Sequence, residues 1–568
     1  MIGSPKAGFH SGETMRFGSR PHPLLLISVA SVLLGLPLFF LGFPLGHDAA
    51  WHLTYEKHFA GQFWEGELYP RWLPDANAGL GSPIFFVYGP VPYWVGSLFR
   101  PLTNWLAVAE REVLELTLSA FIALLASGLA AYLWLRDLHD EVVAACGAVI
   151  YMVIPYHLVA DLYIRSALPE YWSFVWMPLA LYFIRRVVEG SRSALAGLAA
   201  AYAMLIMTHL FSTLLFSVWA ILYAWLLLYQ ARKWPAAAWV LCGFGLGIGL
   251  AAIYLAPAVG HERHIPISRH NLMPKYYYAN NFLGASLSGD EGITFITLLT
   301  LILAGWAFFR TRSPSTKPLA RERGFWFAVS LFCVFMMLPP SRPVWELLPI
   351  LQGIEFPWRF NTILVVCTTA LLTMAMGKLQ AKADNPSLVW LTLVPWVLVM
   401  SVVGTVKMKE MYNRNVELGR TYVAAGYEVH IPVWARGENW GTDALREMRR
   451  VSSGMGLVRG EEAADASVLK WAPRDIRIRV RSEREGSTVV RQLYYPGWEA
   501  HDAASGAGLK IEPTRREGLI RVWVPAGDHE VVLRLHGGAM EGLGTAISGV
   551  CFVALAGGLV VRRLRLRA

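Results

Sequence analysis

The chain has 568 residues, of which 55% are hydrophobic and only 16% are charged, and its mean hydropathy is +0.40. A soluble protein carries about 25% charged residues, so this composition excludes an ordinary soluble globular protein. The net charge of +10 does not indicate a nucleic-acid-binding protein, because the basic residues stand in short clusters between apolar runs rather than along one groove.

Apolar runs that suit membrane-spanning helices recur along the chain. A helix needs about 20 residues to cross about 30 Å of hydrocarbon. The first run is longer than the core of a signal peptide and lacks a small-residue cleavage site, so we expect it to remain as an anchor. The predicted spans lie near 24–44, 114–135, 141–160, 171–185, 193–208, 210–230, 235–256, 292–309, 324–339, 361–377, 387–405 and 543–561.

Lys and Arg are unevenly divided between the loops that join these spans. Twelve spans put both ends of the chain on one side, and the loops fall into two alternating sets. One set holds 20 Lys and Arg residues, and the short loops of the other set hold 10 in almost twice the length. Cytoplasmic loops carry the excess of positive charge, so the first set is predicted to be cytoplasmic. The segments predicted to lie outside are 45–113, 161–170, 257–291, 340–360 and 406–542.

Two of the outer segments differ in character. The segment 406–542 contains runs such as "DIRIRVRS" and "HEVVLRLHG", in which apolar and polar residues alternate as in half-buried strands. We expect a small extracytoplasmic β domain there, without disulfides because all five cysteines fall in predicted spans. The first outer loop, 45–113, is interrupted by several prolines, so short helices on the membrane surface are expected. The predicted division is an α-helical polytopic module over 1–405, the β domain, and a C-terminal transmembrane helix with a basic cytoplasmic tail over 543–568.

The stretch "LGHDAAWHLTYEKH" follows the first span and places a carboxylate among aromatic residues. When residues 47–60 are wound as a helix, Asp48 and His52 share a face with Tyr55, and Lys57 lies opposite. A solvated face would place Asp48 beside Lys57, so the carboxylate is predicted to face protein or a cavity. The alternative is a helix cap at the membrane exit, and position alone does not separate the two.

Ionisable residues from five outer segments are expected near one membrane surface. Charges at this depth are usually functional. Any one of them is more often an interface anchor or a local ion pair, but five segments together favour a shared polar cavity. These residues are Asp48, Asp161, Arg165, Glu170, His209, His261, Arg263, His264, Arg269, Lys275, Glu355 and Arg359.

Such a cavity suits a lipid phosphate and a sugar. Arg binds phosphate through two parallel hydrogen bonds and Lys binds it as a point charge. A neighbouring carboxylate can take a proton from a sugar hydroxyl, and cations can stabilise a departing phosphate. Asp48, His52 and Glu56 are spaced i, i+4, i+8 but form no diagnostic metal motif, so a divalent cation such as Mg or Mn is left open.

Several motifs carry a resemblance to a known family. They are "GHDAAWH" after the first span, "LYPRW" and "GLGSPIFFVYGPVPYW" in the first loop, and "YYPGWEA" and "VPAGDHEVVLRL" near the C-terminus. In these the chain resembles bacterial polytopic proteins of the GT-C glycosyltransferase superfamily. The nearest groups are the YfhO-like and the "6-pyruvoyl-tetrahydropterin synthase-related" membrane proteins.

The resemblance implies a GT-C-like fold in the bacterial inner membrane, for which the apolar runs give about twelve transmembrane helices. It also implies inverting transfer of a sugar from a polyprenyl-phosphate donor on the periplasmic or exterior side. The acidic residue of the first outer loop, taken as the catalytic base in this family, matches Asp48. Many members have two adjacent acidic residues here, whereas this chain has His47 before Asp48. A second acid would come from Asp75, Glu56 or Glu170, or the site works without a metal.

The resulting hypothesis is a glycosyltransferase in which Asp48 is the base and His52 orients or assists it. The acceptor would be a cell-envelope glycan, a glycolipid or a protein, and membrane lipid is the other expected partner. We expect Arg165, Arg263, Lys275 and Arg359 to be candidates for the carrier phosphate. The other predicted substrate-binding residues are Arg71 and Asp75 in the loop wall, Tyr88 for stacking, and Glu170, His209 and Glu355.

Three other functions remain open at this stage. A ligase that moves a whole lipid-linked oligosaccharide would use the same outer cavity. A transporter or flippase would need polar residues at mid-span and paired discontinuous helices, and neither pattern is evident. A catalytically silent scaffold with the same fold would tolerate loss of both Asp48 and Glu170.

Overall fold

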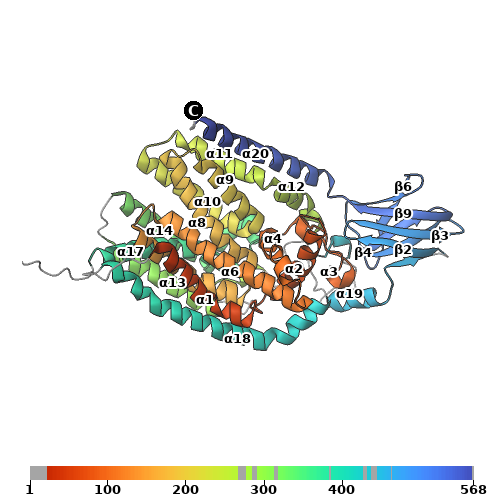
Figure 1. The fold of residues 1–568 in the computed structure, drawn as a ribbon, viewed down its shortest axis with the longest axis horizontal. Coiled ribbons are helices and arrows are strands. Elements are labelled where there is room, and N and C mark those ends of the chain that lie inside the picture. The colour runs from red at the N-terminus through yellow and green to blue at the C-terminus, as the bar shows by residue number, and fades with distance from the viewer. Residues whose placement is uncertain are drawn as a thin grey trace, which may run out of the picture.

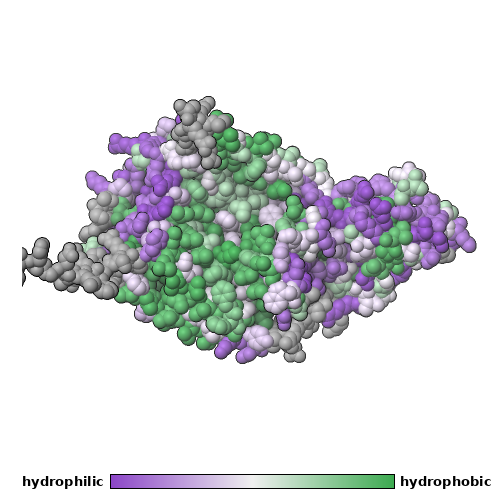
Figure 2. All heavy atoms as spheres, viewed as in Figure 1, coloured by the Kyte–Doolittle hydropathy of each residue, from purple (hydrophilic) through white to green (hydrophobic). Residues whose placement is uncertain are grey.

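The protein consists of a large helical part and a smaller β part joined to one end of it (Figure 1). On the face shown in Figure 2, hydrophobic side chains form a broad band across the helical part, between a hydrophilic edge and the largely hydrophilic β part. This is the surface expected of a protein that crosses a bilayer. The computed structural model describes residues 22–265, 277–284, 291–312, 317–382, 386–425, 431–435, 444–461 and 464–565.

The helices of the first half include every predicted span up to residue 256. They are α1 (Pro23–Leu41), α2 (Ala49–Trp64), α3 (Ala76–Gly79), η1 (Ile84–Phe86), α4 (Val91–Ser97), α5 (Arg100–Thr103), α6 (Val108–Leu135), α7 (Glu141–Val153), η2 (Tyr156–Ile164), α8 (Leu168–Glu189), α9 (Ala194–Thr208), α10 (Leu210–Ala231), α11 (Ala236–Leu250) and α12 (Ala252–His261).

The helices of the second half include the remaining spans. They are η3 (Glu262–His264), η5 (Tyr278–Asn280), α13 (Glu291–Arg310), α14 (Lys317–Met336), η6 (Pro339–Ser341), α15 (Arg342–Leu347), α16 (Pro349–Gln352), η7 (Pro357–Phe360), α17 (Asn361–Gln380), η8 (Pro386–Leu393), α18 (Val394–Ala425), η9 (Val433–Ala435), α19 (Ala444–Ser453) and α20 (Gly538–Arg565).

All twelve predicted spans fall on helices, but they do not all have the length and composition of a simple span. Among the described residues, eight helices are long and apolar enough to cross a membrane, or ten if each bent pair counts as one span. One pair bends by 65° between α11 and α12, and the other by 90° after α14. The predicted spans at 171–185 and 193–208 correspond to α8 and to α9, which has only 15 residues. The exact number of crossings is therefore not fixed by helix length.

The loops predicted to share one side do lie together. Nη2 of Arg186 lies 2.9 Å from Oδ1 of Asp137, and Nζ of Lys233 donates to the main-chain oxygen of Glu189 at 2.8 Å. These contacts join three loops of the Lys- and Arg-rich set. At the other end, the amide of His47 donates to the main-chain oxygen of Ile164 at 3.2 Å, which joins two loops of the opposite set. The alternating topology predicted from charge thus agrees with the fold.

The β part is a pair of antiparallel sheets. Their strand orders are β1-β4-β8-β7 and β2-β3-β9-β5-β6. Burial alternates along β3, as the sequence pattern predicted for half-buried strands. The predicted segment 406–542 begins with helix, because α18 continues to Ala425. The strands are β1 (Val458–Gly460), β2 (Asp465–Ala472), β3 (Asp475–Ser482), β4 (Gly486–Leu493), β5 (Trp498–Asp502), β6 (Gly508–Leu509), β7 (Ile511–Pro513), β8 (Leu519–Val524) and β9 (Gly527–Leu535).

The first outer loop shares one hydrophobic core with the β part. Trp72 and Leu80 of the loop are fully buried in the same cluster as Leu493 and Tyr495. Nε1 of Trp72 donates to Oε1 of Gln492 at 2.8 Å, and the amide of Leu493 donates to the main-chain oxygen of Leu80 at 2.6 Å. The short helices expected in this loop are present, but much of the loop is buried against the β part rather than lying on a membrane surface.

Candidate functional site

At the candidate site, the start of the first outer loop and the segment 161–170 are joined by main-chain hydrogen bonds. The amide of Asp48 donates to the main-chain oxygen of Arg165 at 2.9 Å, and the amide of Gly46 donates to Oγ of Ser166 at 3.0 Å. A Cβ at position 46 would lie 2.4 Å from the main-chain oxygen of Ile164, so only glycine allows this approach. Ser166 itself has a φ of 55°, an unusual value for a residue with a side chain. The segment before Asp48 is therefore fixed against the segment that carries Arg165.

The element η2, which precedes Arg165, is a π-helix of nine residues. π-helical turns are rare, and they occur often at functional sites. It follows Pro155, which cannot continue the hydrogen bonding of α7. The wider turn brings Tyr156 and Asp161 to the same place as Arg165, as their contacts show.

Arg165 is the centre of a buried ion network. Its Nη1 pairs with Asp161 and lies 3.0 Å from Oε2 of Glu170. Its guanidinium also stacks over the ring of Trp358 at 4.6 Å. Glu170 is shared with Arg359, whose Nε lies 3.6 Å from Oε2. Two carboxylates and one guanidinium group of the segment 161–170, together with the guanidinium group of Arg359, thus offset one another's charge inside the protein.

Hydroxyl groups complete the surroundings of Glu170. Tyr156 and Thr362 donate to its Oε1 at 2.8 Å and 2.9 Å. Both residues lie in apolar runs and were not among the predicted site residues. Only the knowledge that Glu170 is buried could have indicated them, because a buried carboxylate needs hydrogen-bond donors.

Asp48 lies at the N-cap position of α2, but its side chain makes no capping hydrogen bond. It is half-buried, and within the described residues no hydrogen bond to its carboxylate is found. Its charge acts on Arg165 and on Asp161. The capping role that position alone allowed is therefore absent, and the carboxylate keeps its acceptor sites beside a cationic group.

His52 is buried one turn further along α2 and contacts a tyrosine rather than the Asp48 carboxylate. Its Nδ1 lies 2.6 Å from the hydroxyl of Tyr93, and its Nε2 is buried without a hydrogen-bond partner in the described structure. Burial lowers the pKa of His52 to about 4, so the ring is neutral near pH 7. Tyr88 belongs to the same aromatic group, with its ring 5.4 Å from Tyr55 and 6.3 Å from Tyr93.

His209 also reaches the ion network, from the tip between α9 and α10. The amide of Ser212 donates to its Nδ1 at 3.3 Å, so the hydrogen of the neutral ring is on Nε2. Burial lowers the pKa of His209 to about 3, and Glu170 and Arg359 act on it electrostatically. Two positions on, the ring of Phe211 lies 5.1 Å from the Arg359 guanidinium.

Other predicted site residues lie apart from this network. Arg71 is buried, and its Nε donates to Glu541 at 2.8 Å. Asp75 is exposed, with Nδ1 of His58 3.8 Å away. Arg263 is exposed and donates from Nε to Nε2 of His264 at 3.2 Å.

The other two predicted site residues are Glu355 and Lys275. Glu355 lies in the turn before η7 with a φ of 65°. Lys275 falls outside the described residues. The structure therefore brings together Asp48, Arg165, Glu170, His209 and Arg359, with His52 and Tyr88 on the neighbouring aromatic side.

The donor set of this site does not match a metal centre. Among the described residues, no group of three or more His, Cys, Asp and Glu side chains is arranged to hold a metal ion. Asp161 and Glu170, the two buried acids of this network, are both paired with Arg165. The guanidinium thus occupies the place between the carboxylates that a cation would need.

Comparison with known proteins places the helical part in a family. A family profile described as "6-pyruvoyl-tetrahydropterin synthase related domain; membrane protein" matches residues 85–411, more than half of the chain. The chain belongs to this family. The part of the chain that matches this family includes Arg165, Glu170, His209 and Arg359, whereas Asp48 and the β part lie outside it. A comparison with the sequences of curated proteins finds no match.

The fold is also similar to parts of two solved structures. One is the arabinofuranosyltransferase AftD from Mycobacteria, with 16% identity and a TM-score of 0.44 over 70% of this chain and 28% of that chain. The other is the arabinosyltransferase EmbB from Mycobacterium smegmatis, with 10% identity and a TM-score of 0.33 over 94% of this chain and 65% of that chain. This chain thus spans between about a quarter and two thirds of these structures, and the scores are too low to relate individual residues.

Proposed function

We propose that this protein is a membrane glycosyltransferase that transfers a sugar from a polyprenyl-phosphate donor to an acceptor outside the cytoplasm. The acceptor would be a cell-envelope glycan, a glycolipid or a protein. The observation that carries the proposal is the Asp48 carboxylate, half-buried and without a capping bond, beside the buried network of Arg165, Glu170 and Arg359. The resemblance of the first-loop motifs to GT-C enzymes, and membership of a family of membrane proteins, support the same reaction class.

In this proposal Asp48 is the general base. Its carboxylate has acceptor sites left for an acceptor hydroxyl, and the positive charge of Arg165 acts on it from the neighbouring segment. The main-chain bond from Asp48 to Arg165, together with the close approach at Gly46, holds the base in one position. Such fixed positioning is worth more to a bimolecular transfer than the strength of the base alone.

Arg359 is the better candidate for the donor phosphate, and Arg165 is a positioning residue. Arg165 is held by both Asp161 and Glu170, whereas Arg359 keeps 12% of its side chain exposed and has Glu170 only at 3.6 Å. Nε2–H of neutral His209 is a second donor on the same side. Together they would offset the charge that develops on the phosphate as it leaves.

The proposed step conserves atoms and charge. The acceptor oxygen gives its proton to Asp48 and forms a bond to the anomeric carbon from the side opposite the phosphate. The bond between that carbon and the phosphate oxygen breaks, and the polyprenyl phosphate leaves with the electron pair. One base and one displacement give inversion at the anomeric carbon. With the Lys- and Arg-rich loops in the cytoplasm, this site would face the periplasm or exterior of a bacterial inner membrane.

Sugar transfer in proteoliposomes tests the proposal. The purified protein is supplied with polyprenyl-phosphate sugars and a mixture of envelope acceptors, and labelled product is counted for wild type, Asp48→Asn and Asp75→Asn. Asp48→Asn should lower the rate by about 100-fold or more, because a general base contributes about 10²–10⁴-fold. Asp75→Asn, an exposed acid of the same loop with the same charge change, should keep the wild-type rate. Full activity of Asp48→Asn would overturn the role of the base.

A further inference from the structure

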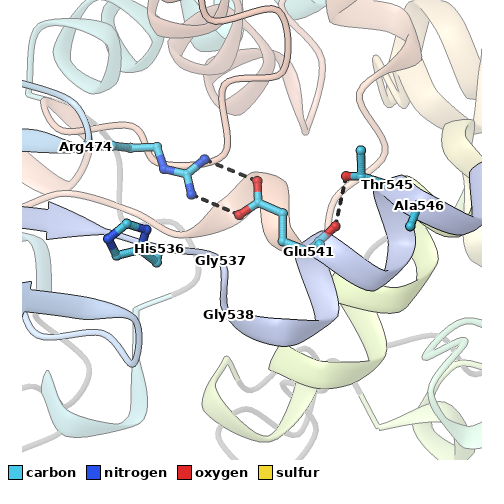
Figure 3. Close-up of a pocket in the computed structure, with 8 residues that line it drawn as sticks. Arg474, His536, Gly537, Gly538, Glu541, Thr545 and Ala546 are labelled. Carbon is cyan, nitrogen blue, oxygen red and sulfur yellow. Dashed lines mark hydrogen bonds and ion pairs between the residues drawn. The ribbon is translucent and has the colours of Figure 1, made fainter. Parts of the chain in front are cut away.

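A cleft lies at the junction between the β part and the last helix, away from the elements that build the Asp48 site. It has a volume of about 570 Å³ and is lined by residues of the β2–β3 turn, the end of β9 and the first two turns of α20. Figure 3 shows Arg474 and Glu541 pointing toward each other across it, with His536 on the side of Arg474. The turn between β9 and α20 is made by Gly537 and Gly538, and the second has a φ of 69°.

The polar groups of the cleft are only partly used. Arg474 donates from Nε to the main-chain oxygen of Leu535 and from both Nη atoms to Glu541, at 3.0, 3.2 and 2.9 Å. A guanidinium has five N–H groups, so two of those of Arg474 remain for another acceptor. Arg71 also donates to the carboxylate of Glu541, through its Nε. Nη1 of Arg71 is buried without a hydrogen-bond partner in the described structure. His536 is exposed at the rim.

Charge in and around the cleft is balanced rather than of one sign. Two arginines, Arg71 and Arg474, share Glu541, and a further acid, Glu67, lies 3.9 Å from Arg474. His536 has Glu499 at the same distance. Surroundings of this kind suit a zwitterion, with a phosphate toward Arg474 and an ammonium group toward the acids, better than they suit a free anion.

The position and shape of the cleft suit a lipid. The helix α20 is almost entirely exposed along its length, with large apolar side chains such as Leu543 and Val550 on its surface. In Figure 2 the hydrophilic β part meets the hydrophobic band of the helical part. Gly542 lines the cleft, and a Cβ there would meet nothing within 4 Å. A headgroup in the cleft could therefore continue into acyl chains along α20.

We infer that this cleft binds the headgroup of a zwitterionic membrane phospholipid, with its phosphate on Arg474 and His536. The bound lipid joins the β part to the bilayer at the point where Arg71 of the first loop, Arg474 of the β part and Glu541 of α20 meet. This site is independent of the proposed glycosyl transfer, since none of its residues belongs to the Asp48 network.

Two pairs of variants distinguish the effect of a change in the cleft from the effect of the same change elsewhere in the molecule. Gly542→Leu fills the cleft without changing charge, and Gly557→Leu makes the same change about 22 Å further along the same helix, where a Cβ also meets nothing. Arg474→Gln removes the phosphate contact, and Arg484→Gln removes an equal charge beyond the far end of β3. Because Leu favours a helix over Gly, Gly542→Leu is expected to fold.

Native mass spectrometry of the purified full chain in detergent measures the outcome, with added phosphatidylethanolamine, diacylglycerol, undecaprenyl phosphate or inorganic phosphate. We expect phosphatidylethanolamine to bind the wild type, Gly557→Leu and Arg484→Gln alike, and Gly542→Leu and Arg474→Gln at least about ten-fold more weakly. Equal binding of diacylglycerol, or undiminished binding to Gly542→Leu, would overturn the inference. Tighter binding of undecaprenyl phosphate, or displacement by millimolar inorganic phosphate, would overturn it too, by identifying a different phosphate-bearing ligand.

Discussion

Replacing Glu170 by Gln should destabilise the protein more than any other substitution of similar size and shape in the Asp48 site. The side chain is only 2% exposed, and its Oε2 serves Arg165 at 3.0 Å and Arg359 at 3.6 Å. The amide of Gln can still accept from the hydroxyls of Tyr156 and Thr362, so the variant isolates the loss of charge. Removing one partner of a buried ion pair costs about 3–5 kcal/mol, because the other charge is left without compensation.

Thr362→Val is the matched comparison for that change. It removes one hydrogen bond to the same carboxylate and keeps the shape of the side chain, so it should cost about 1.5–3 kcal/mol. Thermal unfolding in detergent, followed with a thiol-reactive dye, reports both variants because Cys146, Cys333 and Cys367 are buried in the folded protein. Glu170→Gln should unfold at a lower temperature than Thr362→Val, which should unfold below wild type. If Glu170→Gln were as stable as wild type, the ion network would not hold this site together.

Three further outcomes follow from single positions. Gly46→Ala would put a Cβ 2.4 Å from a main-chain oxygen of η2, so transfer activity should fall about 100-fold. Gly61→Ala is the control, because a Cβ at this position of α2 meets nothing, and it should leave transfer activity unchanged. Equal activities of the two variants would show that the close approach is unimportant. Burial raises the pKa of Glu56, so the folded state keeps a proton that the unfolded chain releases, and stability should fall as the pH rises above about 4.5. Unfolding temperatures of Glu56→Gln should fall less than those of wild type over that range, and parallel curves would contradict the buried proton. Gln492→Leu would leave the buried indole N–H of Trp72 unpaired at a cost of about 1–3 kcal/mol, so limited proteolysis should cleave near the β part faster than in wild type.

The alternating arrangement of loops was predictable because it depends only on apolar length and on the placement of Lys and Arg. The number of crossings was less predictable, since α11 and α12 read as one apolar run but meet at an angle of 65°. No local pattern distinguishes such a bend from a straight helix. Likewise, alternating residues predicted the strands, whereas the continuation of α18 to Ala425, within the segment predicted to lie outside, was not predicted.

The candidate site was predictable in its charged members and not in its geometry. Arg165, Glu170 and Arg359 were expected together because charged residues in short outer loops must lie near the same membrane surface. Arg71 was expected in the wall of the first loop, but it pairs with Glu541, which lies 470 positions later, next to the predicted C-terminal span. A pairing of that kind depends on how α20 packs, and the sequence of the first loop does not specify it.

A cryo-EM map of the protein in nanodiscs with a bound polyprenyl-phosphate sugar tests most directly whether Asp48 and Arg359 face the two ends of one reaction. The phosphate should lie within hydrogen-bond distance of Arg359, with the anomeric carbon placed so that a single acceptor oxygen fits between it and the Asp48 carboxylate. Density for the sugar phosphate beside Arg71 or Arg263, with the Asp48 carboxylate facing protein alone, would contradict the proposed reaction.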